Sequence, residues 1–186
     1  MWRALCSAAV LAATLTGWSV TAPAAGEYPL TLTVEAQAKT KATTVTTTFT
    51  IRVERLMDES RYKQVTDALK YNGYSKFFNV FRTLPVIGAI ELENRQVELK
   101  YAREQQEDGA RRLLLVADRP LFFFGGAPDK ARAGYDLTIV DLRFDAQGAA
   151  SGTMAGAARV KPSPSGIVLD TYAETVIQLK ARVSRP

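Results

Sequence analysis

The residues of this sequence that could support catalysis are carboxylates, because the chain of 186 residues contains no histidine and only one cysteine, Cys6. A Ser-His-Asp triad, a catalytic thiol in the body of the chain and an ordinary zinc site are therefore excluded. No glycine motif of the P-loop or dinucleotide-binding type occurs. Glycoside hydrolysis needs only two acids at a suitable separation. The candidate acids are Glu91, Asp118, Asp136 and Asp141.

Asp141 is the most informative of these acids because it lies within a predicted strand. Alternation along that strand would place its side chain on the same face as Leu137 and Ile139. A carboxylate on such a face needs a cationic partner, for which Arg119 or Arg143 could serve. The alternative is an Asp141 that faces solvent or forms a salt bridge.

The other acidic residues that could take part in catalysis or metal binding have simpler explanations. Asp118 is expected to form a turn beside Pro120, which donates no backbone hydrogen bond. Calcium could bind to carboxylate oxygens, but the D-x-D-x-D-G spacing is absent. The sequence therefore favours a non-enzymatic protein over a carboxylate-based hydrolase, and it predicts neither a cofactor nor a metal site.

Aromatic residues indicate a second kind of site, an apolar cavity. Three consecutive phenylalanines at residues 122–124 cannot all point to one side of a strand. At least one of them would be covered by helices, a partner or a ligand. The candidate lining residues are Phe77, Phe78, Phe81, Tyr101, Phe122, Phe123, Phe124 and Tyr135. The alternative is that the helical aromatic residues simply pack in the core.

The N-terminal segment, residues 1–25, has the three parts of a secretory signal: a positive start, an apolar run and small residues at its end. Cleavage is predicted after Ala24 or Ala25. The apolar run is too short and too diluted by polar residues to span a membrane, and no second long apolar segment follows. The sequence thus predicts a periplasmic or secreted protein with no integral membrane segment after signal removal.

Charge does not indicate a nucleic-acid partner. The formal net charge is +5, but the basic residues are scattered and no run of five like charges occurs. The oligomeric state is not predicted. After signal removal, residues 26–186 are enough for one domain with an ordinary core.

Hydrophobic periodicity predicts a domain of the α+β class that consists mainly of β-strands. Alternation of period two indicates about ten short strands, beginning with a hairpin at residues 30–38 and 44–55. Between the second and third strands the period changes to 3.6, which predicts a two-helix hairpin at about 58–84 with a break at Asn72-Gly73. Short antiparallel strands at this spacing form a β-barrel or a sandwich.

Two strands have unusual compositions. Residues 112–117 are apolar with little alternation, so this strand is expected to be buried on both faces. Residues 152–160 are rich in glycine and alanine, which would let another backbone or a bound molecule approach closely.

Several motifs together resemble a group of small exported bacterial proteins of unknown function. They are the helical hairpin, V-I-G at residues 86–88, A-D-R-P-L at residues 117–121, and Y-D-L-T-I-V-D-L-R-F-D-A-Q-G at residues 135–148. The resemblance covers residues 53–183. It implies a bacterial envelope or secreted setting and carries no activity, cofactor or catalytic residue.

Two functions remain open on these observations. The first is a binding module for a small apolar or amphipathic ligand, held in a cavity between sheet and helices. The second is an envelope interaction or structural protein that docks a protein partner through an exposed strand edge or a phenylalanine patch.

Overall fold

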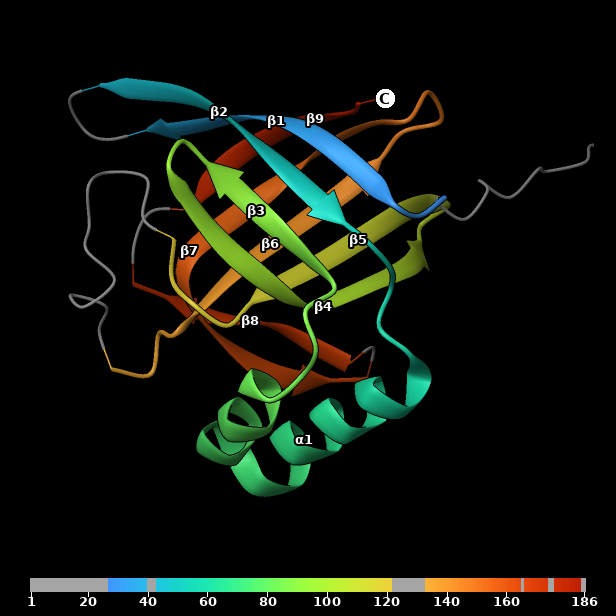
Figure 1. Ribbon diagram of the computed structural model, residues 1–186, viewed down its shortest axis with the longest axis vertical. Helices are drawn as coiled ribbons and strands as arrows, with labels where there is room; N and C mark the ends of the chain where they lie inside the picture. The colour runs from blue at the N-terminus through green and yellow to red at the C-terminus, as the bar shows by residue number, and fades with distance from the viewer. Residues whose placement is uncertain (1–26, 40–42, 122–132, 165, 174–175, 185–186) are drawn as a thin grey trace, which may run out of the picture.

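The computed structural model describes residues 27–39, 43–121, 133–164, 166–173 and 176–184. Within these residues, nine antiparallel strands and one helix form a β-barrel with an added strand (Figure 1). The elements are β1 (Leu30–Lys39), β2 (Thr44–Val53), α1 (Glu59–Arg82), β3 (Gly88–Leu92), β4 (Arg95–Glu107), β5 (Ala110–Ala117), β6 (Leu137–Phe144), β7 (Ala149–Ser163), β8 (Gly166–Tyr172) and β9 (Ile177–Val183). Of the two predicted architectures, barrel and sandwich, the chain adopts the barrel.

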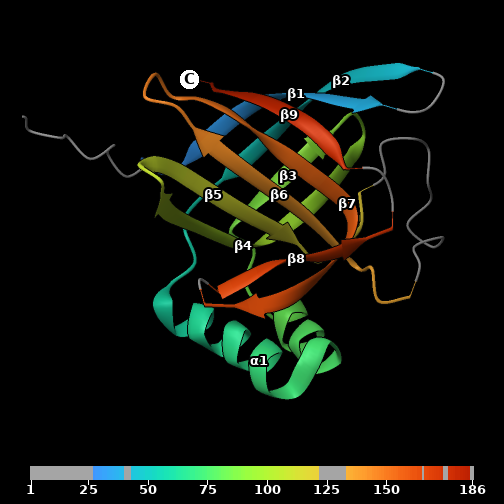
Figure 2. The same ribbon diagram turned by 180° about the vertical axis from the view of Figure 1, so that it is seen from behind.

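The sheet closes through its last strand. β1 to β7 follow one another as antiparallel neighbours, and β9 lies between β7 and β1. β9 pairs with residues 149–154 of β7, whereas β8 pairs with residues 158–163 of the same strand. β8 is therefore an extra strand outside the eight-stranded barrel (Figures 1 and 2).

Apolar side chains fill the barrel interior. Along β1, buried Leu32 and Val34 alternate with exposed Thr33 and Glu35, as the sequence predicts. Inward-pointing side chains with no exposed surface include Leu32, Ile51, Ile90, Leu99, Leu113 and Leu142. A barrel of eight strands has just enough room for its own side chains. This part of the interior is therefore packed core.

β5 is buried on both faces, which confirms the prediction for residues 112–117. Leu113 and Leu115 point into the barrel and are fully buried. Leu114 points outward, yet it is only 7% exposed, and it lines a cleft together with Leu169 of β8. The outer face of the barrel at β5 is thus covered by another part of the chain.

α1 consists of two helical segments joined at a non-helical Gly73, so the break predicted at Asn72-Gly73 is present, while the two segments form one kinked element and not the predicted hairpin of separate helices. It begins at Asp58, whose Oδ1 accepts a hydrogen bond of 2.9 Å from the backbone N–H of Arg61. At Gly73 φ is +76°, a conformation that side chains disfavour, and the helix axis bends there. The break expected at Asn72-Gly73 is therefore a kink within Glu59–Arg82.

Nine of the predicted strands are present in the described part of the chain. The tenth, the strand expected to contain the phenylalanines at residues 122–124, lies outside the described residues.

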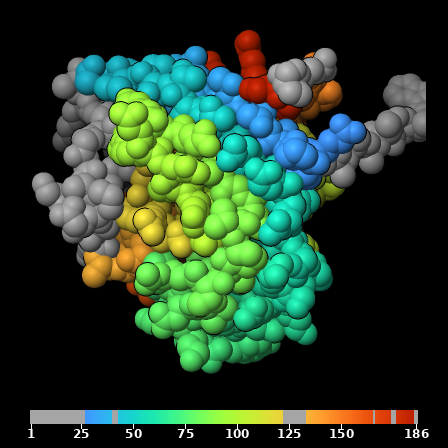
Figure 3. Space-filling view, in the orientation of Figure 1, coloured from blue at the N-terminus to red at the C-terminus, as the bar shows by residue number. Residues whose placement is uncertain are grey.

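α1 packs on one side of the barrel, where it forms a separate lobe (Figure 3). There the rings of Tyr62 and Tyr101 lie 6.4 Å apart, and Arg103 of β4 donates a hydrogen bond of 2.8 Å to Glu59.

Candidate functional site

A network of four charged side chains lies on the outer face of β4, β5 and β6. Arg112 forms a bidentate pair with Asp141: Nε donates to Oδ1 at 2.8 Å and Nη2 to Oδ2 at 2.6 Å. Nη1 of Arg112 also lies 3.3 Å from Glu107, which accepts a second hydrogen bond of 2.7 Å from Arg143. Asp141 thus has the cationic partner that its position requires. That partner is Arg112 rather than the predicted Arg119 or Arg143.

This network closes one end of a cleft of about 200 Å³ between the outer face of the barrel and β8. We call it the β8 cleft. Its lining residues are Arg112, Leu114, Ile139, Asp141, Thr153, Ala155, Val168 and Leu169. The walls are mostly aliphatic, with three residues from the barrel strands facing two from β8. Polar groups are confined to the Arg112–Asp141 pair and the Thr153 hydroxyl.

The polar end of the cleft carries a compensated charge. The Arg112 side chain is 15% exposed and that of Asp141 is 31% exposed. The hydrogen bonds with Asp141 raise the pKa of Arg112, so the guanidinium remains protonated. The cleft therefore offers an approaching molecule a neutral, strongly dipolar pair instead of a free charge.

A fully buried tyrosine lies near this network. Tyr101 has no exposed surface, and its hydroxyl has no hydrogen-bond partner among the described residues. Burial, more than any other effect, raises the pKa of Tyr101, and Arg103 and Arg112 oppose that shift electrostatically. Its ring packs under Tyr62 of α1. Tyr101 is therefore a core residue at the junction between α1 and the site.

We expect replacement of Tyr101 with phenylalanine to raise the free energy of unfolding by about 1 kcal/mol, because a buried hydroxyl without a partner costs stability. Urea denaturation followed by circular dichroism measures this change. Tyr135→Phe is the matched control, since its hydroxyl accepts a hydrogen bond of 3.3 Å from Thr171. A loss of stability in Tyr101→Phe would contradict the expectation.

The structure does not gather the predicted aromatic residues around one cavity. Phe77 and Phe81 are fully buried and stack on each other with ring centroids 5.3 Å apart. Phe78 is partly buried and stacks on Tyr74 at 6.1 Å, whereas Tyr135 contacts Thr171. Residues 122–124 lie outside the described residues. In the described part of the set, Phe77, Phe81 and Tyr101 are core side chains.

The remaining predicted polar residues do not join Asp141. Asp118 keeps one buried carboxylate oxygen without a partner among the described residues. Arg119 is exposed, and its backbone oxygen accepts a hydrogen bond of 2.8 Å from Thr138. The other candidate acids have separate partners: Glu91 lies 3.7 Å from Arg52, and Asp136 accepts from Tyr74 at 3.4 Å. Among the described residues, none of these four acids shares a hydrogen bond or an ion pair with another of the four.

Comparison with known proteins leaves the class of this protein open. The chain matches no protein-family model, no curated protein and no solved structure. The resemblance to small exported bacterial proteins stays a prediction, and the predicted signal peptide, residues 1–25, lies outside the described residues. Within the described residues, no helix combines the length and apolar character needed to cross a membrane.

Proposed function

We propose that this protein is a non-enzymatic binding module that holds a small, mostly apolar molecule with one polar group in the β8 cleft. One observation carries the proposal: an aliphatic cleft between barrel and β8 ends at the bidentate Arg112–Asp141 pair. Binding sites for small molecules are typically apolar, with a few fixed polar groups that orient the ligand. In the β8 cleft, five of the eight lining residues are aliphatic, and the Arg112–Asp141 pair is the fixed polar group.

The volume of the cleft restricts the ligand. About 200 Å³ lies below the range of roughly 300–1,000 Å³ that is usual for drug-sized ligands. The apolar part of the ligand should therefore be a short chain or a single ring. The larger grooves on the surface are more open to solvent, which favours the more enclosed β8 cleft for an apolar group.

The polar end supports binding more than catalysis. Both carboxylate oxygens of Asp141 already accept hydrogen bonds from Arg112, which holds the carboxylate in one orientation. Thr153 has no side-chain hydrogen bond to other described residues and can pair with a ligand. The two groups can thus position a ligand hydroxyl, amide or similar polar group at the polar end of the cleft.

We also propose that the protein acts outside the cytoplasm, on the basis of the signal-like sequence of residues 1–25. The test is native mass spectrometry of the protein purified from its own envelope. An intact mass that corresponds to a chain beginning at Ala25 or Gly26 would support export. A non-covalent adduct of a few hundred daltons, lost on denaturation, would support ligand binding and identify its occupant.

We expect Val168→Trp to abolish this adduct, because the half-buried Val168 side chain lines the cleft and an indole would fill it. Leu169→Trp should have the same effect from the adjacent position. Val45→Trp is the control, since Val45 is 42% exposed on β2 and remote from the cleft. Circular dichroism verifies folding. An adduct that survives both cleft substitutions in folded protein would refute the β8 cleft as the site.

A second candidate function rests on the sheet edge. Of the described strands, β8 alone pairs with another strand on one side only. An unpaired edge can accept a strand from a protein partner, as expected for an envelope interaction protein. An unliganded protein that associates with itself or crosslinks to one envelope protein would favour this second function over ligand binding.

A further inference from the structure

The wall of the β8 cleft changes from polar to apolar in an order that strand register sets. Asp141 on β6 is directly opposite Thr153 on β7. The next residues on the same face of these strands, Ile139 and Ala155, are also directly opposite each other. All four line the cleft. A row of two oxygen-bearing side chains is therefore followed by an aliphatic row.

Asp141 is the more accessible member of the polar pair, with its side chain 31% exposed against 15% for Arg112. Nε and Nη2 of Arg112 donate to Asp141, and Nη1 donates to Glu107, so all three guanidinium nitrogens are engaged. Each carboxylate oxygen of Asp141 accepts one of these bonds and has a further lone pair. The polar end of the cleft therefore offers a ligand hydrogen-bond acceptors on Asp141.

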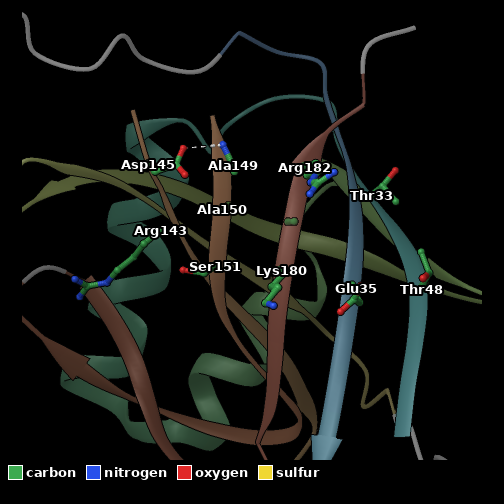
Figure 4. A pocket seen from close by; sticks show the side chains of 11 residues that line it. Thr33, Glu35, Thr48, Arg143, Asp145, Ala149, Ala150, Ser151, Lys180 and Arg182 are labelled. Atoms are coloured by element: carbon green, nitrogen blue, oxygen red, sulfur yellow. Dashed lines mark hydrogen bonds between the residues drawn. The ribbon is translucent and has the colours of Figure 1, made fainter. Parts of the chain in front are cut away.

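Two cations on the barrel surface beside the cleft have acidic neighbours. Arg143 donates a hydrogen bond of 2.7 Å to Glu107. Lys180 on β9 is directly opposite Glu35 on β1, and Figure 4 shows these two side chains on the same outer face. Neither cation therefore provides an isolated positive charge for an anionic ligand.

Thr153 supplies a second hydrogen-bonding group beside Asp141. Its side chain makes no hydrogen bond with other described residues. Because the two residues are directly opposite each other, their Cβ atoms lie about 5 Å apart. A ligand group held between them can donate a hydrogen bond to Asp141 and accept one from the Thr153 hydroxyl. A neutral hydroxyl group does both, whereas an ether oxygen only accepts.

We propose that the ligand of this protein is a small neutral alcohol whose hydroxyl group lies between Asp141 and Thr153, donating to the first and accepting from the second. Its hydrocarbon part lies along the aliphatic row of the β8 cleft. The inference rests on the proposed binding function and specifies its ligand class. A cationic ligand at Asp141 would lie beside the guanidinium of Arg112, which already neutralises that carboxylate. An ionic ligand would thus lose its hydration without gaining an uncompensated partner, whereas a hydroxyl group gains two hydrogen bonds.

The test is an NMR titration of the protein with hexanol, with its isomer methyl pentyl ether, which has no hydroxyl donor, and with hexanoate and hexylammonium. We expect hexanol to bind about tenfold more tightly than each of the others, because it alone is neutral and donates a hydrogen bond to Asp141.

Two matched variants locate the hydroxyl group. Thr153→Val keeps the side-chain shape but removes the hydroxyl, so it should weaken hexanol binding about fivefold and leave the affinity for methyl pentyl ether within about twofold. Thr46→Val makes the same change at an exposed position on β2 that does not line the cleft, and it should leave both affinities unchanged.

The outcomes separate this inference from the proposed function. If hexanol and methyl pentyl ether bind equally and Val168→Trp blocks both, the alcohol class is refuted while the apolar site stands. If hexanoate or hexylammonium binds more tightly than hexanol, the site prefers an ion and the inference is wrong. An effect of Thr46→Val as large as that of Thr153→Val would also overturn it. If none of these molecules binds, both the inference and the β8 cleft are refuted.

Discussion

Replacement of Gly152 with alanine should lower the free energy of unfolding by about 3 kcal/mol or more. A Cβ atom at this position would collide with the backbone oxygen of Asp141 and lie 2.9 Å from Cα of Leu142. Both atoms belong to the backbone of β6, which cannot move without breaking its pairing with β7. The sequence predicted that small residues in this strand admit another backbone, and β6 is that backbone.

Chemical denaturation of the variant measures the expected loss, with Ser151→Ala as the control. Ser151 is the preceding residue on the same strand and is exposed, so its change should stay within about 0.5 kcal/mol. A Gly152→Ala protein as stable as the control would mean that β6 and β7 approach each other less closely than the present geometry requires.

The second large effect is expected at Phe81, where alanine should cost about 3–5 kcal/mol. The Phe81 side chain is fully buried and stacks on Phe77, so truncation leaves a cavity between α1 and the rest of the core. Thermal and urea denaturation measure the loss. Tyr71→Ala, on the same helix but 69% exposed, should be close to neutral.

This experiment also decides between the two interpretations of the helical aromatic residues. Core packing requires that Phe81→Ala destabilises the protein. A ligand-lining role requires that Phe81→Ala loses the bound molecule and keeps its stability. Loss of a ligand from a fully stable variant would therefore contradict the core assignment and move the site towards α1.

Much of the fold could be predicted because burial alternates along each strand. In β1, buried and exposed residues alternate as predicted, residue by residue. The apolar run of β5 correctly predicted a strand that is buried on both faces. Closure of the barrel could not be predicted. It depends on pairing between β9 and β1, and nothing in either strand specifies a partner so far away in the sequence. At Gly73 the sequence does not distinguish a kink from the end of a helix, because glycine is common at both.

The candidate site could be predicted only in part. Asp141 stood out because a carboxylate shares a strand face with Ile139, and both residues do line the β8 cleft. Its partner, Arg112, was missed because the pair depends on the register between β5 and β6. The sequence does contain one indication of this pair: Arg112 lies two residues before Leu114, on the same strand face, at the start of an otherwise apolar strand. The place of β8 over this face has no local signature, since it follows from where β7 extends beyond β9.

The pairing of β9 with both β1 and β7 has a consequence for how the protein is made. Because β9 follows all the other described strands in the chain, the two edges that it joins stay open until β9 is in place. Contacts between such distant segments are slow to form, since a long loop must close first. The barrel therefore closes only after all of its described strands, from β1 to β9, are present. A chain that lacks β9 therefore keeps these two edges of the sheet open.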